Sequence, residues 1–297
     1  MFDLRYHVAS LAAVFFALVI GILVGVALAS HGLGNTERKR LERSVDDANK
    51  RAERAQDTVA ALTDEGRADA AFVDKAYDAV MTDRLQGRRI AVLFIGSVNG
   101  ELLKSVNRTL TDADAPPRLR LRAVTVPLDD AAIDRVLNRR PQLAAYAGPD
   151  NLGDLGRELA DEFALGGDTP VWDALQNQLV EERNGTMRRS ADGIVVVRTA
   201  QPQADGTARF LHGLFSELAD RAIPVVGVES SASKPSAVPV YRRYSLSSVD
   251  DLDQAVGRVA LALLLSDAPP GAYGTKKTAT DGVLPDVLPI STPNAGG

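Results

Sequence analysis

The first feature along the chain is an uninterrupted apolar run over residues 8–29. Its sequence, VASLAAVFFALVIGILVGVALA, contains no charged side chain. A helix rises about 1.5 Å per residue, so a helical run of this length spans a hydrocarbon core of roughly 30 Å. We therefore predict a single transmembrane helix within a membrane anchor over residues 1–34.

A cleaved signal peptide is the alternative interpretation of this run. Ala27, Leu28 and Ala29 have the small-x-small form of a cleavage site, and Arg5 gives a weakly positive start. The apolar run is longer than the roughly 7–15 residues of a signal peptide, and a helical pattern follows it closely. Both features favour an uncleaved anchor.

Two glycines and the flanking charges bear on how the anchor sits in a membrane. Gly21 and Gly25 form a G-x-x-x-G step, which lets membrane helices approach closely, so we predict that they pack anchors together. Basic residues at 38–40 and 43 follow the run, while Arg5 precedes it. By the positive-inside rule, this distribution favours a cytoplasmic side for the segment after the anchor.

Beyond the anchor, apolar residues alternate at spacings of four and three, which is the a/d seam of a coiled coil. The seam consists of Leu41, Val45, Ala48, Ala52, Ala55, Val59 and Leu62. We predict a coiled-coil stalk over residues 35–87 that joins copies of this chain; a single amphipathic helix lying on its own domain is the alternative. Gly66 interrupts the seam, and we expect a second helical segment from Phe72 to near Gly87.

The pattern then changes to short apolar runs that alternate with helical ones, which is typical of a parallel sheet covered on both faces by helices. The expected strands are residues 89–96, 119–127, 194–199 and 223–229. The expected helices lie near residues 100–110, 129–139, 152–165, 172–183, 208–222 and 249–265. We predict a three-layer, mostly parallel α/β domain over residues 88–267, followed by a Pro/Gly-rich tail over residues 268–297 that is extended or disordered.

Composition narrows the chemistry that this architecture can perform. The chain has 297 residues, of which 45% are hydrophobic and 25% charged, as expected of one or two folded domains. It contains no cysteine, which excludes disulfides, thiolate metal sites and cysteine nucleophiles. With 34 Lys and Arg against 39 Asp and Glu the net charge is −5, so we expect no nucleic-acid partner.

One glycine-containing loop is a candidate binding site. Residues 96–100, Gly-Ser-Val-Asn-Gly, lie between an expected strand and an expected helix, where doubly wound folds bind phosphate groups. The loop lacks the full G-x-G-x-x-G pattern, and no Walker lysine follows it. A plain turn is the favoured interpretation, and an enzyme that binds a phosphorylated ligand here is the alternative.

Acidic residues gather at two expected helix starts. Asp129 and Asp130 form one group, and Asp250, Asp251 and Asp253 form the other. Carboxylates at these positions bind free amide groups and oppose the helix dipole favourably. We therefore expect both groups to cap helices rather than to bind a metal ion.

Histidine and serine give no catalytic or metal-binding pattern. His7, His31 and His212 are the only histidines, and their spacing matches no ligand pair. No G-x-S-x-G elbow accompanies the serines of residues 230–248. We expect a protein that is not an enzyme, name no catalytic or cofactor-binding residue, and leave any metal ligands unknown.

Several segments have the character of family signatures rather than of catalytic motifs. They are the opening MFDLRYHVASLAAVFFALVIGILVGVAL, the heptad stalk, DGIVVVRTAQP, YSLSSVDDLDQAVGRVALALLL and GAYGTKKTATDGVLP. Together they resemble the actinobacterial copper transporter family typified by MctB, over nearly the whole chain. The resemblance implies a single-pass protein of the cell envelope or outer membrane, concerned with copper efflux or tolerance, whose α/β domain lies outside the cytoplasm.

The residues themselves provide little for copper to bind. Copper(I) prefers soft sulfur ligands, and the chain offers only Met1, Met81 and Met187. One apolar helix per chain forms a pore only through oligomerisation. We expect a membrane-anchored homo-oligomer with a role in copper efflux or tolerance, in which copper is implied by the resemblance alone. The alternative is a scaffolding envelope protein whose α/β domain binds a partner and transports nothing.

Overall fold

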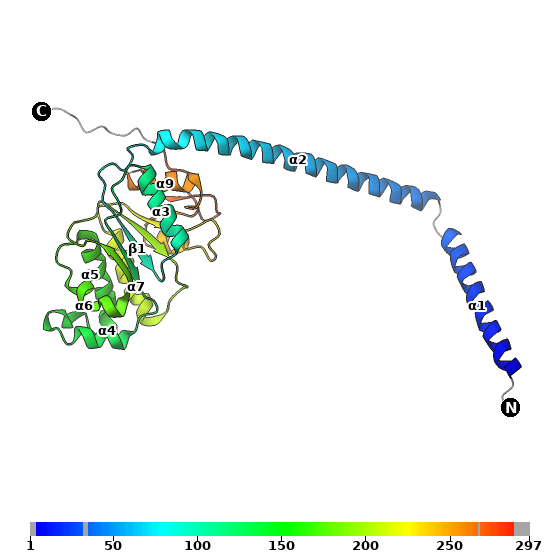
Figure 1. Ribbon diagram of the computed structural model, residues 1–297, viewed down its shortest axis with the longest axis horizontal. Coiled ribbons are helices and arrows are strands. Elements are labelled where there is room, and N and C mark those ends of the chain that lie inside the picture. The colour runs from blue at the N-terminus through cyan, green and yellow to red at the C-terminus, as the bar shows by residue number, and fades with distance from the viewer. Residues whose placement is uncertain (1–3, 32–34, 267, 288–297) are drawn as a thin grey trace. The chain divides into compact units, whose positions relative to one another are not determined.

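The computed structural model describes residues 4–31, 35–266 and 268–287. Contacts between residues divide the chain into two compact units, unit 1 (Met1–Ala70) and unit 2 (Ala71–Gly297). Unit 1 contains helix α1 (Leu4–His31) and most of helix α2 (Asn35–Met81) (Figure 1). Within the described residues, no helix has the combined length and apolar character needed to cross a membrane, so the predicted anchor is not confirmed.

Helix α2 continues through Gly66, so the predicted interruption at this residue is wrong. A glycine in a helix costs only about 1 kcal/mol relative to alanine, and the neighbouring residues favour helix. Arg67 also donates to Asp64 across the glycine, with Nη1 2.9 Å from Oδ1. The helix ends at Met81, and residues 82–87, expected to be helical, form turns instead.

Unit 2 is built on a seven-stranded sheet in which every neighbouring pair of strands is parallel except β2 and β3. The strand order is β3-β2-β1-β4-β5-β6-β7. The strands are β1 (Ile90–Ile95), β2 (Arg120–Val124), β3 (Val180–Gly185), β4 (Gly193–Arg198), β5 (Val225–Val228), β6 (Ser247–Val249) and β7 (Ala272–Tyr273). The predicted mostly parallel α/β fold is confirmed.

Helices cover both faces of this sheet (Figure 1). They are α3 (Gly100–Asp112), α4 (Asp130–Leu137), η1 (Pro141–Tyr146), η2 (Pro149–Asn151), α5 (Leu152–Leu165), α6 (Pro170–Leu179), α7 (Asp205–Ala219), α8 (Val238–Arg243) and α9 (Ala255–Leu265). Alternate side chains of β1 point to opposite faces: Leu93 joins the core under α4 to α8, and Val92 joins the core under α3, α9 and the end of α2. Both are fully buried.

Two expected helices begin or end as strands. The helix expected over residues 172–183 ends at Leu179, and the chain continues as β3, which pairs antiparallel with β2. The helix expected over residues 249–265 begins only at Ala255, and residues before it form β6. In both places pairing with a neighbouring strand outweighs the local helical pattern.

Two residues of the expected tail join the sheet, and a third binds to it. Ala272 and Tyr273 form β7, which pairs with β6. Lys276 then returns to the carboxyl end of β5, where its Nζ lies 2.6 Å from Glu229 Oε1. Residues 274–287 consist of turns, bends and irregular backbone, and residues 288–297 lie outside the described residues.

Candidate functional site

The strand order places a crevice at the carboxyl end of β1. This strand pairs with β2 on one side and with β4 on the other, so the connections that follow β1 and β4 leave the sheet edge in opposite directions. Open parallel sheets bind ligands outside the carboxyl ends of their strands at such a reversal, because the diverging loops leave room between them.

A pocket of about 190 Å³ lies at this point, and we name it the switch-point pocket. Its walls come from the segments that follow β1, β4 and β5. The lining residues are Asn99, Leu102, Arg198, Thr199, Ala200, Gln201, Pro202, Ser230, Ser233, Lys234, Pro235 and Ala237. Of these three loops, only the one after β1, residues 96–100, was identified from the sequence as a candidate binding site.

The loop of residues 96–100, for which the sequence favours a plain turn over a phosphate-binding site, contributes Asn99 to this pocket. Gly96 has φ +99°, and a Cβ there would lie 2.8 Å from Thr199 Oγ1. Thr199 in turn donates from Oγ1 to Ser97 O at 2.7 Å, so the loops after β1 and β4 are held together. Asn99 lines the pocket and caps α3 by accepting from Leu102 N at 3.0 Å, whereas Gly100 is not among the lining residues.

The pocket has a positive charge. Arg198, at the end of β4, and Lys234, after β5, both line it. Within the described part of the chain, neither cationic group has a hydrogen-bond or ion-pair partner, and no acidic residue lines the pocket. The amino end of α3 adds the partial positive charge of a helix dipole.

A buried ion pair fixes the wall formed by residues 230–237. Lys276 Nζ donates to Glu229 Oε1 at 2.6 Å, to Ser230 O at 2.7 Å and to Ser233 O at 3.2 Å. Glu229, only 2% exposed, also accepts from the Ser236 hydroxyl and from Ala237 N. All three donors of one ammonium group therefore hold this loop. Lys276 falls in the segment expected to be a tail, so its role was missed from the sequence.

The three aspartates expected to cap a helix have other roles. Asp250, fully buried, accepts from Thr275 N at 2.9 Å and from Lys276 N at 3.2 Å, and so positions the lysine backbone. Asp253 accepts from Ser231 N at 2.6 Å. By contrast, Asp129 accepts from Ala132 N at 2.9 Å, which confirms its predicted role as the cap of α4.

Asp251 is a fully buried carboxyl group whose charge is poorly satisfied. Neither side-chain oxygen makes a hydrogen bond of normal geometry within the described residues, although the Thr275 side chain lies near enough to favour the charged form weakly. Burial, and then the neighbouring charge of Asp250, raise the pKa of Asp251 to about 6. The folded protein therefore favours its neutral form below that pH.

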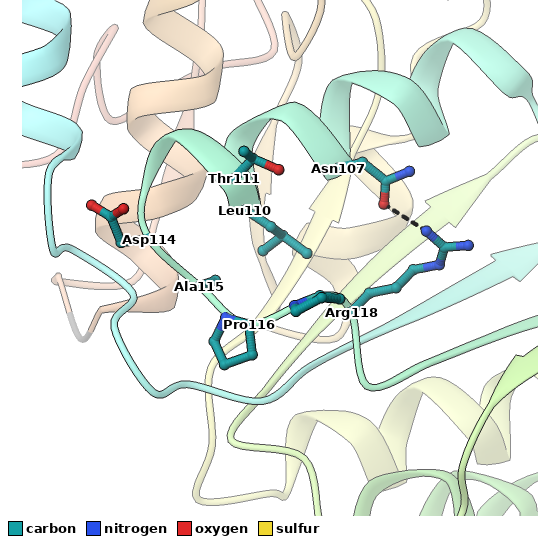
Figure 2. Close-up of a pocket in the computed structure, with 8 residues that line it drawn as sticks. Asn107, Leu110, Thr111, Asp114, Ala115, Pro116 and Arg118 are labelled. Atoms are coloured by element: carbon teal, nitrogen blue, oxygen red, sulfur yellow. Dashed lines mark hydrogen bonds between the residues drawn. The ribbon is translucent and has the colours of Figure 1, made fainter.

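A second pocket, of about 460 Å³, lies at the amino ends of the strands, between the end of α3 and the start of β2 (Figure 2). Figure 2 shows Arg118 reaching toward Asn107, and Nη1 donates to Oδ1 at 2.9 Å. Asp114 also lines this pocket and accepts from Asp83 N at 2.9 Å. The Asn107 amide oxygen and the Asp114 carboxylate thus already accept hydrogen bonds from the protein, and the pocket lies at the amino ends of the strands, so we favour the switch-point pocket.

The methionines and histidines form no copper site in the described residues. Met81 is 1% exposed in the core on one face of the sheet, and Met187 packs on the other face, 3.5 Å from Arg120 Nη1. His212 Nδ1 lies 3.2 Å from Tyr244 Oη, and the side chains of His7 and His31 lie outside the described part of the chain. No group of three or more His, Cys, Asp or Glu in the described chain is placed to hold a metal ion.

The residues predicted to join copies lie in unit 1 on uncovered helix surfaces. Leu41 is 68% exposed and Val59 62% exposed, and the other seam positions are exposed as well. A Cβ added to Gly21 or Gly25 would meet no other atom within 4 Å. The coiled coil and the packing of anchors stay predictions.

Comparison with known proteins covers both units. A family described as "Copper transport outer membrane protein, MctB" matches residues 1–284. The chain belongs to the MctB family. Curated relatives named "Copper transporter MctB" occur in Mycobacterium bovis and Mycobacterium tuberculosis. Each is 26% identical over 313 residues, covering 93% of this chain and 96% of the relative.

The matched range includes the segment with β7 and Lys276, residues 271–277 (GAYGTKK). Gly274 in this segment has φ +136°, and a side chain there would overlap the carboxylate of Asp250. A residue other than glycine at this position would therefore disturb the contacts that position Lys276 at the wall of the switch-point pocket.

Proposed function

We propose that this MctB-family protein is a membrane-anchored homo-oligomer of the cell envelope that takes part in copper efflux or tolerance. The observation that supports this most strongly is the family match, which runs from residue 1 to residue 284 and so includes the anchor, the stalk and the sheet. The copper function comes from the family description and from the relatives' printed name.

The surface of α1 supports the anchoring. Large apolar side chains from Leu11 to Val26 are exposed, and they lie on all sides of the helix. Burying one such side chain contributes about 1.5–3 kcal/mol, so leaving the whole set in water is unfavourable. A helix that is apolar all round is expected to be buried in lipid or protein.

The surface of α2 supports the oligomer. Before Gly66, its large exposed apolar residues lie on the a/d seam, and the charged residues between Leu41 and Leu62 all lie off it. Ion pairs within the helix, such as that of Lys50 Nζ with Asp46 Oδ2 at 2.7 Å, keep those other positions solvated. A narrow seam flanked by charges is the surface that coiled coils bury.

Copper is the cargo in this proposal rather than a resident ion. The burial of Met81 and the lack of a metal-ligand cluster in the described residues argue against stable coordination in unit 2. Assembled anchors are the part of the protein that offers a path across lipid, because unit 2 has no lipid-compatible surface of comparable size in its described residues.

The decisive experiment is deletion of the gene followed by complementation. We expect the deletion strain to accumulate copper and to grow poorly in copper-supplemented medium, and the full chain to restore both. The double variant Leu41→Ser/Leu62→Ser should restore neither, whereas the surface variant Asp57→Ser should restore both. Unchanged copper content and copper sensitivity in the deletion strain would contradict the proposal.

A scaffolding role is the second candidate, and the absence of a metal-ligand cluster from the described residues favours it. In this role unit 2 binds a partner in the envelope and nothing is transported. Full-length protein reconstituted in liposomes distinguishes the two functions. Copper flux that depends on the protein excludes pure scaffolding, and a copper phenotype without flux supports it.

We also place unit 2 outside the cytoplasm, following the family description, although the charges at residues 38–43 favour the opposite side. A topology reporter tests this placement. It is best fused after residue 297, because a fusion near residue 267 would separate β7 from the sheet. Activity of a periplasmic reporter is expected, and activity of a cytoplasmic reporter alone would refute the placement.

A further inference from the structure

The switch-point pocket has features of a ligand site that copper transport does not require. It combines a position at the reversal of strand order, a volume of about 190 Å³ and walls from three loops. Its cationic groups, Arg198 and Lys234, have no partner in the described chain, and the acidic residue nearest in sequence to the wall, Glu229, is already neutralised by Lys276.

The charge of the pocket determines the class of ligand. Two uncompensated cations, with no acidic residue among the described lining, favour an anion and disfavour a copper ion. Thr199 Oγ1 already donates to Ser97 O, and the Ser230 and Ser233 hydroxyl groups bond to each other, which leaves one of these two serines a hydroxyl proton for a ligand. The amino end of α3 lies beside the same pocket through Asn99. A dianionic phosphate group with several acceptor oxygens matches this set better than a single carboxylate does.

The size of the pocket limits the ligand further. Pockets for drug-sized ligands typically occupy about 300–1,000 Å³, and this pocket is smaller. A nucleotide or dinucleotide would extend well beyond it. It has room for a phosphate group on a short carbon chain or for inorganic phosphate.

The wall at residues 230–237 is held in position by contacts within the protein itself. Lys276 fixes the backbone of Ser230 and Ser233, and Asp250 fixes the backbone of Lys276. Burying an ion pair costs desolvation, and replacing such a pair by apolar residues is often neutral or stabilising. We therefore infer that this network holds the geometry of the loop more than it raises the stability of the fold. A loop that is already in its binding geometry binds a ligand more tightly.

We propose that the switch-point pocket binds a small phosphorylated compound, whose phosphate group lies between Arg198 and Lys234 at the amino end of α3. Arg198 supplies a forked pair of N–H donors, and Lys234 supplies a point charge from the facing loop. The side chain of Lys234 is exposed, so it can move toward the ligand without disturbing the core. This assignment is independent of the proposed copper function.

Calorimetric titration of the full chain, purified in detergent in phosphate-free buffer, tests the assignment. The probes are inorganic phosphate, glycerol 3-phosphate and, for comparison, malonate. We expect saturable binding of at least one phosphate probe and tighter binding of that probe than of malonate. Because hydrogen bonds to charged groups are among the stronger ones, Arg198→Gln/Lys234→Gln should weaken binding tenfold or more.

The matched control is Arg243→Gln/Lys277→Gln, which removes the same two charges from positions outside the pocket. It should alter the affinity by less than about twofold, which is the size expected from a change in distant screened charges. No saturable binding of either phosphate probe would overturn the proposal. Equal losses in the two double variants, or tighter binding of malonate, would overturn it as well.

Discussion

Unit 1 and unit 2 differ in how far their apolar side chains are buried. In unit 2, the strands of the sheet are covered on both faces by helices of the same chain, and residues such as Val92 and Leu93 are fully buried. In unit 1, the apolar residues of α1 and of the α2 seam are exposed, with Leu11 77% and Leu41 68% accessible. Unit 2 therefore buries most of its large apolar residues within one chain, whereas unit 1 leaves those of α1 and the α2 seam exposed.

This difference indicates where assembly and stability are determined. Each Val or Leu of the seam gains about 1.5–3 kcal/mol when it is buried, and we infer that another molecule supplies that burial. Mutations in unit 2 should therefore change the free energy of unfolding, and mutations in unit 1 should change the free energy of self-association. Trp172, the sole tryptophan and nearly buried in unit 2, gives a fluorescence signal for the first of these effects.

The largest expected effect is in unit 2, at the crossing of α5 and α7. A Cβ at Gly213 would overlap the carbonyl group of Gly153, so the two helices pack backbone to backbone. Gly213→Ala should destabilise unit 2 by about 3 kcal/mol, because overpacking forces the helices apart. Urea unfolding followed by Trp172 fluorescence measures this loss. An unchanged midpoint would show that the crossing is looser than the structure indicates.

The next effect is in unit 1, on the seam. Val59→Ser should weaken self-association of the full chain by about 2 kcal/mol per chain, since it replaces an apolar contact with a hydroxyl group. Analytical ultracentrifugation in detergent measures the change. Thr58→Val, one position away and off the seam, is the control and should leave association unchanged. A shift in the Trp172 unfolding midpoint with Val59→Ser would contradict the separation of the two units.

A smaller effect depends on pH and is confined to unit 2. The folded pKa of Asp251, about 6, lies above its ordinary value of 3.8, so ionisation is penalised in the folded state. This group stabilises the fold fully below about pH 4, and the contribution is lost as the pH rises through 6. Asp251→Asn cannot ionise, so it should raise stability at pH 7.5 by about 1–2 kcal/mol relative to wild type.

Paired urea unfolding curves at pH 4.5 and pH 7.5 test this expectation. The difference between Asp251→Asn and wild type should shrink markedly at the lower pH. Asp220→Asn, at an exposed position after α7, should show no such dependence. A difference that is the same at both values would mean that Asp251 is not the titrating group.

The smallest expected effect comes from a glycine-to-alanine substitution in unit 1, at Gly66, which parallels Gly213→Ala in unit 2. A Cβ at Gly66 would meet no atom within 4 Å, so Gly66→Ala should stabilise α2 by about 0.5–1 kcal/mol through helix propensity alone. Circular dichroism of the full chain during thermal unfolding measures this gain. The same substitution thus has opposite signs in the two units, and a loss of helix in Gly66→Ala would remove the contrast.

Much of the fold could be predicted from local patterns. The apolar runs at residues 89–96 and 194–199 gave β1 and β4 to within about two residues, because buried parallel strands have continuous apolar sequences. β3 has the polar sequence VEERNG at the edge of the sheet, and β6 and β7 are very short. Such strands depend on a neighbour rather than on their own composition, so sequence patterns missed them.

The candidate site was less predictable for a different reason. The loop of residues 96–100 was visible as a turn between strand and helix, but Arg198, Lys234 and Lys276 come from three distant segments. Only the strand order brings them together. Lys276 could have been suspected from its place in the GAYGTKK block, although nothing in that block alone indicates that its partner is Glu229.

We infer that the α2 seam of unit 1 is covered by another copy of the chain, and oxidative cross-linking tests this inference. The chain has no cysteine, so a single introduced thiol reports without background. Ala52→Cys lies on the seam, and Asp57→Cys lies on the opposite face of α2. Disulfides form only when Cα atoms approach to about 4.4–6.8 Å, as at the a positions of a parallel coiled coil. After diamide treatment of membranes, we predict disulfide-linked dimers of Ala52→Cys and monomeric Asp57→Cys. Monomeric Ala52→Cys, or equal cross-linking of both variants, would contradict the claim.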